Sequence, residues 1–177
     1  MAWVVAVNPA AGARPVAMDG LRRTLEEVGV EATIETPPDI PAMRRLIAEA
    51  VSVPRLAVVG GDGTVNLAVN SLFETGVSKF PVLGVLPAGS GCDLLRTFGI
   101  PNDLARAAAH LATDTVYPID VGELSGSWGV RRFVNVAQAG VGAAAAYTAL
   151  RLPRRLGSSR YVMAFGIRLP RFPRTEV

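Results

Sequence analysis

The sequence predicts an α/β fold: a Rossmann-like parallel sheet with helices on both faces, followed by the start of an incomplete, β-rich second domain. Three observations favour this fold class. Apolar runs of strand length alternate with helical patterns from residue 3 to residue 112. Glycine-containing turns follow three of these runs. Hydrophobic residues make up 50% of the chain and aromatic residues only 6%, which fits alternating strands and helices better than an all-β fold.

The expected elements follow one another in the order of a parallel sheet. Continuous or alternating apolar runs predict strands, and apolar residues spaced by three and four predict helices. The expected strands are 3–7, 30–35, 55–59, 82–86 and 115–121, and the expected helices are 16–28, 41–50, a helix directly after Thr64, 92–98 and 102–112. Right-handed crossovers place all strand-to-helix turns at one sheet edge, where open α/β sheets bind their ligands.

The pattern changes after Gly122. Residues 123–138 predict an antiparallel hairpin around a Ser-Gly-Ser-Trp-Gly turn, and helices are expected at 142–152 and 159–169. A lone hairpin is only marginally stable in water. We therefore expect residues 1–122 to form a nucleotide-binding α/β domain and residues 123–177 to begin a second domain that this chain does not complete.

Charge is distributed unevenly along the chain. The formal net charge is +3, yet residues 151–177 hold 7 of the 18 basic residues and one of the 15 acidic ones. Two interpretations stay open: a solvated helix surface, or contact with an anionic lipid or phosphate. Nucleic-acid binding is disfavoured because the tail lacks a recognisable motif. A single cysteine and the absence of a secretion signal predict a cytoplasmic protein, with a peripheral position at the inner membrane face as a further option.

The central motif is Gly60-Gly61-Asp62-Gly63-Thr64, between an apolar strand and a helix. Such a turn can hold phosphate, because glycines allow close approach and the helix start offers free N–H groups. It is neither a Walker A loop nor a dinucleotide fingerprint, since Asn66 stands at the third glycine position. The carboxylate of Asp62 suggests a metal ion or a hydroxyl that must lose its proton. The alternative is a tight turn in which Asp62 caps its own helix.

Further carboxylates are expected at the same sheet edge. Asp93 begins a helix after the Pro87–Gly91 turn, and Asp120 ends the expected strand 115–121. With Asp62 they form a donor set that suits Mg²⁺ held through water, although capping and turn formation explain Asp93 and Asp120 as well. One histidine and one cysteine argue against a zinc site.

Four ordered motifs resemble the diacylglycerol kinase catalytic domain, a family that includes bacterial lipid kinases and sphingosine kinases and whose first domain is similar to NAD kinases and phosphofructokinases. The motifs are Asn8-Pro9-x-x-Gly12, Gly60 to Asn66, Pro87-x-Gly89-Ser90-x-x-Asp93-Leu94, and Asp120-x-Gly122.

The resemblance implies ATP, Mg²⁺ and transfer of the γ-phosphoryl group to a lipid hydroxyl such as that of diacylglycerol. It implies that Asp62 is catalytic and that Asp62, Asp93 and Asp120 hold the metal through water. The implied nucleotide-binding positions are Asn8, Pro9, Gly12, Thr36, Gly60, Gly61, Asp62, Gly63, Thr64, Val65, Asn66, Gly89 and Ser90. The implied partner is a lipid alcohol at a membrane surface, without nucleic acid or a transmembrane span, and a homodimer is left open.

Three departures from the family pattern leave alternatives open. Leu67 replaces the usual Glu and lies off the apolar stripe of its helix, so we expect core packing not to explain it. Cys92 and Ser90 replace Asn and Thr, and the family's second domain, with a late acidic motif, extends beyond residue 177. The alternatives are a catalytically impaired nucleotide-binding or regulatory module and an NAD-kinase-like enzyme acting on a soluble nucleotide.

Overall fold

The computed structural model describes residues 2–12, 16–88, 92–157 and 159–172. The chain divides into two compact units, Met1–Asn135 and Val136–Val177, and each is described by itself.

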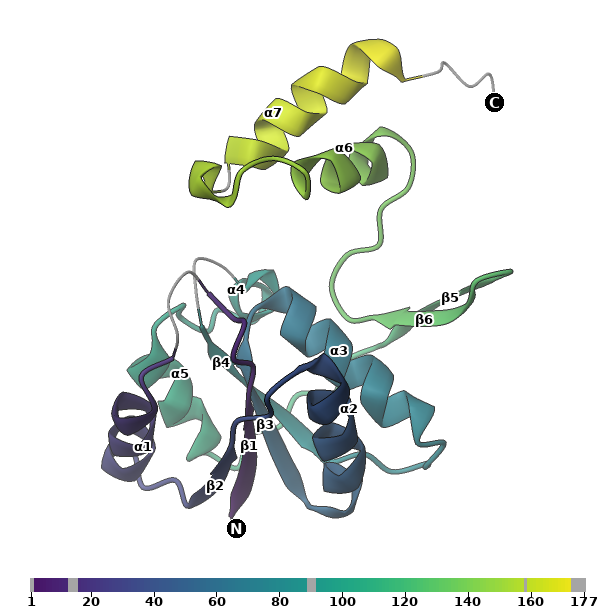
Figure 1. Cartoon of the computed structure of the whole chain (residues 1–177). Coiled ribbons are helices and arrows are strands. Elements are labelled where there is room, and N and C mark those ends of the chain that lie inside the picture. The colour runs from purple at the N-terminus through teal and green to yellow at the C-terminus, as the bar shows by residue number, and fades with distance from the viewer. Residues whose placement is uncertain (1, 13–15, 89–91, 158, 173–177) are drawn as a thin grey trace. The chain divides into compact units, whose positions relative to one another are not determined.

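A four-stranded parallel sheet forms the centre of the first unit (Figure 1). Its spatial order is β2-β1-β3-β4. The second strand lies on one side of β1, and the third and fourth strands follow on the other side. The strands are β1 (Trp3–Val7), β2 (Ala32–Glu35), β3 (Arg55–Gly60) and β4 (Val82–Pro87). This topology confirms the predicted fold class and four of the five expected strands.

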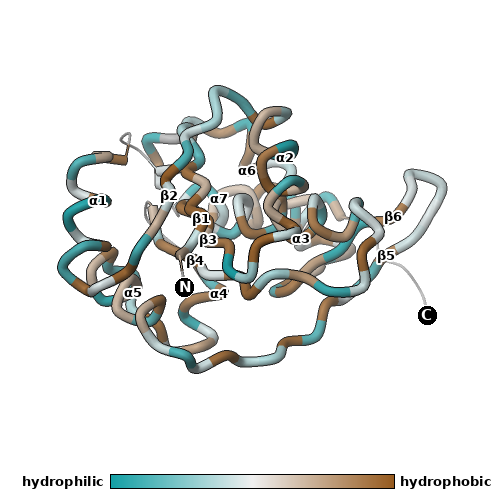
Figure 2. The backbone as a smooth tube through the Cα atoms, turned by 90° about the horizontal axis from the view of Figure 1, so that it is seen from below, coloured by the Kyte–Doolittle hydropathy of each residue, from teal (hydrophilic) through white to brown (hydrophobic). Residues whose placement is uncertain are grey.

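Helices cover both faces of this sheet, as predicted. They are α1 (Met18–Glu27), α2 (Ile40–Glu49), α3 (Asp62–Glu74), α4 (Asp93–Thr97) and α5 (Leu104–Leu111), with a 3-10 turn at Ala50–Ser52. Side chains alternate along β3: Val58 packs with α2, α3 and α4, whereas Val59 packs with α1 and α5. Figure 2 shows the hydrophobic strands at the centre and hydrophilic stretches along α1.

Aspartate side chains fix where two of the helices begin. Asp39 accepts a hydrogen bond from the Ala42 amide at 2.7 Å at the start of α2, and Asp103 accepts one from the Arg106 amide at 2.9 Å at the start of α5. Trp3 Nε1 donates to the Leu111 carbonyl at 3.2 Å, which ties the end of α5 to the first strand.

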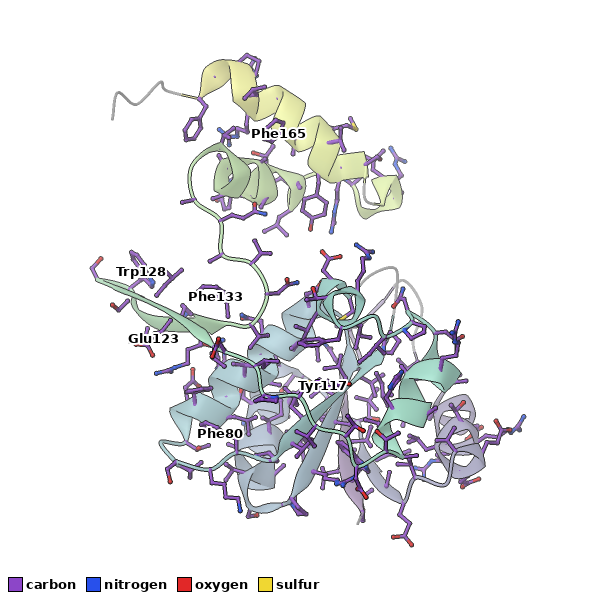
Figure 3. The ribbon with its side chains drawn as sticks, turned by 180° about the vertical axis from the view of Figure 1, so that it is seen from behind. Phe80, Tyr117, Glu123, Trp128, Phe133 and Phe165 are labelled. Atoms are coloured by element: carbon purple, nitrogen blue, oxygen red, sulfur yellow. The ribbon has the colours of Figure 1, made fainter. Side chains whose placement is uncertain are left out.

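The fifth strand expected at 115–121 is not formed. These residues have no regular secondary structure and pair with no strand, and β4 is the edge of the sheet in the described part of the chain. Val116 and Tyr117 are 54% and 70% exposed, so the apolar run that suggested a buried strand has no core to enter. Pro118 also lacks the N–H that a ladder requires. Figure 3, seen from behind, shows Tyr117 in this segment.

The predicted hairpin is present as β5 (Gly122–Gly126) and β6 (Gly129–Phe133), paired antiparallel. Gly129 has φ 96°, a conformation that favours glycine, at the turn beside Trp128 (Figure 3). Contacts between β6 and α3 hold the hairpin in the first unit, so the division between units falls after Asn135 rather than at residue 122. That residues 123–177 begin a second domain of a longer protein stays a prediction.

The second unit is a pair of helices, α6 (Val141–Ala149) and α7 (Ser159–Arg168), with 3-10 turns at Arg154–Leu156 and Leu169–Arg171. Its core is small, consisting of Ala145, Ala149 and Ala164 with Leu152 packed against them. Arg168 Nε also donates to Thr148 Oγ1 at 2.6 Å. Among the described helices, none has the length and apolar character needed to cross a membrane.

Candidate functional site

The turn between β3 and α3 is closed tightly over its own helix. Thr64 is 4% exposed and lies directly above Gly60. A Cβ on Gly60 would lie 2.5 Å from Thr64 Cβ and 2.8 Å from its Cγ2, so no side chain fits there. Gly63, by contrast, faces open space, with nothing within 4 Å of the position of a Cβ. The two glycines therefore serve different purposes: Gly60 allows packing, and Gly63 leaves room above the helix start.

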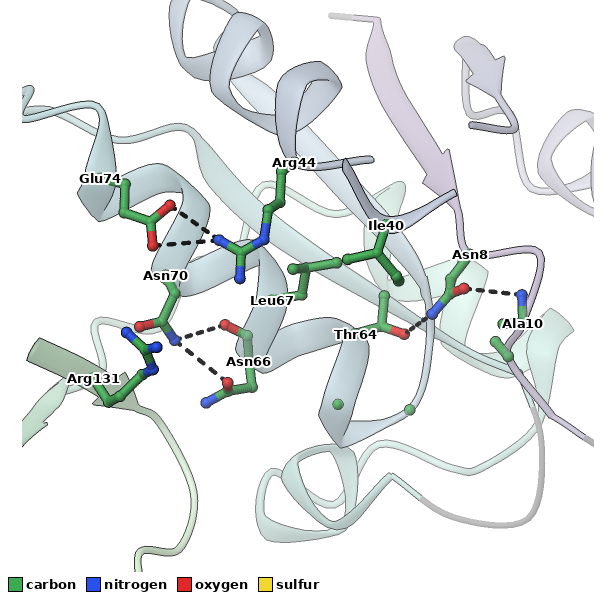
Figure 4. Close-up of a pocket in the computed structure, with 13 residues that line it drawn as sticks. Asn8, Ala10, Ile40, Arg44, Thr64, Asn66, Leu67, Asn70, Glu74 and Arg131 are labelled. Atoms are coloured by element: carbon green, nitrogen blue, oxygen red, sulfur yellow. Dashed lines mark hydrogen bonds and ion pairs between the residues drawn. The ribbon is translucent and has the colours of Figure 1, made fainter. Parts of the chain in front are cut away.

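Asn8 connects the turn after β1 to the start of α3. Its Nδ2 donates to Thr64 Oγ1 at 2.8 Å, and its Oδ1 accepts from the Ala10 amide at 2.9 Å. The Asn8 amide itself donates to the Val59 carbonyl at 3.1 Å. One side chain thus holds two of the predicted ligand-binding turns in a fixed relation, as Figure 4 shows.

A cavity of about 430 Å³ lies beside these turns. It follows one face of α3 for about three turns, between α2 on one side and the hairpin on the other (Figure 4). Its lining comes from the turn after β1, the start of α2, the face of α3 and β6: Asn8, Ala10, Ala11, Ile40, Arg44, Gly61, Gly63, Thr64, Asn66, Leu67, Asn70, Glu74 and Arg131. The first three strands thus lead into the same cavity, as the parallel topology predicts.

Leu67 corrects one sequence-based expectation. We expected no packing role for it, because it lies off the main apolar stripe of α3. The structure instead places it half-buried, packed against the core on the α2 and α3 face, with Ile40 beside it in the cavity wall (Figure 4). The apolar residue at this position therefore has a packing reason that the sequence pattern did not reveal.

Asp62 does not cap its own helix, so this alternative is wrong. The N-cap of α3 is Gly61, without a side-chain cap, and Asp62 is the first helical residue. Its carboxylate instead accepts hydrogen bonds from the Asp93 amide at 3.0 Å and the Leu94 amide at 3.2 Å. These are the first amides of α4, whose N-cap Cys92 supplies no side-chain cap. Asp62 therefore caps the neighbouring helix.

Cys92 lies against the same carboxylate. It is 3% exposed, and its Sγ donates to Asp62 Oδ1 at 3.7 Å. Burial raises the pKa of the Cys92 thiol, and the negative charge of Asp62 acts in the same direction. The thiol therefore stays protonated at neutral pH and acts as a packed donor.

The three carboxylates predicted to hold Mg²⁺ lie in different structural surroundings. Asp93 begins α4 beside Asp62 and pairs with Arg96 at 2.8 Å. Asp120 is exposed in the segment 114–121, outside the sheet, so no strand carries it to the sheet edge. In the described ranges, no three His, Cys, Asp or Glu side chains form a metal-binding group. The oxygen donors of Asp62 and Asp93 are of the kind that suits Mg²⁺ held through water, and this role stays a prediction for all three residues.

The other predicted nucleotide-binding positions differ in their relation to the cavity. Gly61, Gly63, Thr64 and Asn66 line it. Val65 is buried in the core, so its side chain is not available to a ligand. Pro9, Gly12 and Thr36 are exposed, and they are not part of its lining. Gly89 and Ser90 lie outside the described residues.

Four of the polar or charged lining residues were not predicted: Arg44, Asn70, Glu74 and Arg131. Asn70 and Glu74 follow Asn66 at intervals of four, so helical periodicity could have placed them on the face of α3 that carries the motif. The sequence held no comparable signal for Arg131, because its place depends on how the hairpin docks.

These features define an α/β protein with a ligand cavity at the carboxyl ends of its parallel strands. The model of the diacylglycerol kinase catalytic domain matches residues 2–124. A diacylglycerol kinase of Bacillus subtilis is 34% identical over 124 residues, which cover 69% of this chain and 39% of that protein. A diacylglycerol kinase of Mycobacterium tuberculosis is 32% identical over 164 residues, which cover 90% of this chain and 52% of that protein.

A solved structure of a diacylglycerol kinase is also similar to this chain. The chain resembles the crystal structure of a diacylglycerol kinase from Bacillus anthracis with a TM-score of 0.58 and 26% identity, over 68% of this chain and 46% of that one. The chain therefore belongs to the diacylglycerol kinase catalytic domain family. It spans about half of the length of these relatives, or less.

Proposed function

We propose that this chain is the nucleotide-binding part of an ATP- and Mg²⁺-dependent lipid kinase that transfers the γ-phosphoryl group to a lipid hydroxyl such as that of diacylglycerol. The observation that supports this most is the cavity beside α3. Asn8, Gly63 and Thr64, three positions that the family motifs mark for the nucleotide, meet there from two separate turns.

The chemistry of phosphoryl transfer asks mainly for positioning and charge neutralisation. The backbone at Gly61 and Gly63 and the start of α3 offer N–H groups to phosphate oxygens. The oxygens of Asp62 and Asp93 are suited to hold Mg²⁺ through water, and the ion would neutralise phosphate charge when bound. The lipid oxygen forms a bond to the γ-phosphorus, the bond between that phosphorus and the bridging oxygen breaks, ADP leaves, and the hydroxyl proton passes to water.

The test combines the 177-residue protein with labelled ATP, Mg²⁺ and vesicles that contain diacylglycerol. Formation of labelled phosphatidate supports the proposal, with Asp62→Asn as the inactive comparison. Labelled NAD phosphate after addition of NAD would instead indicate a soluble nucleotide kinase. If neither product forms while ATP still binds, this chain does not catalyse the transfer by itself.

A second candidate is a nucleotide-binding module without catalysis. The hydrogen bonds from Asp93 and Leu94 favour it, because they give Asp62 a structural role that requires no metal. If this candidate holds, Asp62→Asn changes the stability of the protein but leaves ATP binding independent of Mg²⁺. Calorimetric titration of ATP with and without Mg²⁺ separates the two cases.

A further inference from the structure

The cavity beside α3 contains three ionised side chains, and two of them neutralise each other. Arg44 Nη1 donates to both carboxylate oxygens of Glu74, at 3.0 and 3.3 Å. The third, Arg131, donates from Nη1 to the Val130 carbonyl of its own strand at 2.9 Å. In the described part of the chain, no carboxylate pairs with Arg131. The cavity therefore carries a positive charge on the side of the hairpin.

The neighbouring arginine is engaged differently. Arg132 lies over the ring of Phe73, with its guanidinium 4.6 Å from the ring centroid, and pairs with Glu123 at 2.7 Å. Its charge is thus used within the hairpin and against α3. Of the two adjacent arginines of β6, Arg132 is paired with a carboxylate, whereas Arg131 lines the cavity without an ion pair in the described part of the chain.

A buried asparagine holds this strand in place. Asn70 is 6% exposed, and its Nδ2 donates to the Arg132 carbonyl at 2.9 Å while its Oδ1 accepts from the Arg132 amide at 2.9 Å. The side-chain amide thus pairs with the backbone of β6 as a neighbouring strand would. Asn66 Nδ2 adds a third hydrogen bond, to the same carbonyl, at 2.9 Å.

This arrangement couples the docking of the hairpin to the charge of the cavity. The backbone N–H and C=O of Arg132 are fixed on α3, and Arg131 is the residue next to it in the chain. A shift of β6 along α3 would break two or three hydrogen bonds of a largely buried group, which is costly. Asn70 therefore fixes the backbone from which the Arg131 side chain extends.

We propose that Arg131 binds the phosphate chain of the nucleotide in this cavity and that Asn70 is its positioning residue. The inference rests on the proposed function for the identity of the ligand. Gly61 and Gly63, at the start of α3, line the same cavity as Arg131. A polyphosphate bound there would meet N–H donors at the start of α3 and a guanidinium at the hairpin, and both are groups that bind phosphate oxygens.

The experiment measures binding by isothermal titration calorimetry on the 177-residue protein, with ATP and with inorganic tripolyphosphate as separate probes. Arg131→Gln is expected to weaken both by about tenfold, as for loss of one charge-assisted contact. The control is Arg106→Gln, which removes the same charge from α5 on the opposite face of the sheet and is expected to change Kd less than twofold. Equal effects of the two substitutions would overturn the proposal.

Asn70 is tested through its coupling to Arg131. Asn70→Ala is expected to weaken tripolyphosphate binding by a similar factor, and to add nothing in the Arg131→Gln background. Loss that is additive in the double variant would show a role that does not pass through Arg131. Asn70→Ser, a milder change that can keep one of the hydrogen bonds, gives the same comparison if Asn70→Ala fails to fold.

The two probes distinguish this inference from the proposed function. ATP binding that does not depend on Arg131 overturns the inference and leaves the kinase proposal standing. Tripolyphosphate binding that depends on Arg131, without ATP binding, supports the anion site and counts against the kinase. Binding of neither probe overturns both.

Discussion

Replacing Gly60 by alanine is expected to destabilise the protein, although the motif around it suggests a purely ligand-binding role. The new Cβ would lie 2.5 Å from Cβ of Thr64 and 2.8 Å from its Cγ2. Thr64 Cβ belongs to α3, so it moves only with the helix backbone, and Thr64 Oγ1 accepts the hydrogen bond from Asn8. Overpacking of this kind costs about 1–3 kcal/mol, and loss of the hydrogen bond adds about 1 kcal/mol.

Gly63 supplies the matched control within the same motif. Nothing lies within 4 Å of its Cβ position, and it sits inside α3, where alanine is favoured. Gly63→Ala is therefore expected to raise the free energy of unfolding by about 0.5–1 kcal/mol in the absence of ligand. Gly63→Ala is nevertheless expected to weaken ATP binding, because the methyl group would face the cavity.

Urea denaturation followed by circular dichroism measures both changes without any ligand. The free energies of unfolding of Gly60→Ala and Gly63→Ala should differ by at least about 1.5 kcal/mol, from the sum of the two effects. Thr64→Gly in the Gly60→Ala background removes the contacting atoms and should recover part of the loss, as a coupling of about 0.5–3 kcal/mol. Equal stabilities of the two alanine variants would refute the packing explanation.

Three further outcomes follow from the same contacts. Asp62→Ala should lower the free energy of unfolding by about 1–2 kcal/mol in metal-free buffer, as expected for loss of a helix cap. Asp93→Ala removes only an exposed ion-pair partner, so it should lower the free energy of unfolding by less than about 1 kcal/mol. Urea denaturation measures both changes. Because folding raises the pKa of the Cys92 thiol, the folded state binds its proton more tightly than the unfolded state. This contribution to stability is fully present below the thiol pKa of the unfolded chain and is lost as the pH rises through the thiol pKa of the folded protein. Alkylation of Cys92 should therefore be slow at neutral pH, and fast labelling of the native protein would contradict the protonated, buried thiol. Leu67→Glu should cost about 1–2 kcal/mol through lost packing, whereas the more exposed Ile40→Glu should not, since an acid is favoured in the first turn of a helix; equal losses would refute the packing role of Leu67.

Much of the fold could be predicted because its signals are local. The apolar runs of β1, β3 and β4 and the stripe of α3 are each decided by neighbours in sequence, and glycine-containing turns mark where strands end. The strand expected at 115–121 is not formed, although β4 leaves an edge of the sheet open in the described part of the chain. Its residues are apolar enough for a strand, but Pro118 cannot donate to a ladder, and this local signal outweighs the apolar run.

The candidate site could be predicted where the backbone conformation requires a particular residue type, such as glycine. Gly60 and Gly63 were singled out together, but the sequence could not show that one is needed for packing and the other for open space. Asp62 was expected to act on its own helix or on a ligand. Its hydrogen bonds to α4 cross from one turn to the next, and only the folded chain brings these turns together.

The face of α3 at Asn66 and Asn70 explains why the cavity and the hairpin belong to one site. Asn66 lines the cavity and also donates to the Arg132 carbonyl, while Asn70 lines the cavity and holds the same peptide by two hydrogen bonds. A ligand that draws the Asn66 amide toward itself would remove one of the three bonds on that peptide but leave the Asn70 pair intact. Because the remaining pair fixes both N–H and C=O of Arg132, the strand keeps its register. Hence one asparagine can respond to the ligand while the other keeps the hairpin, and with it Arg131, in place.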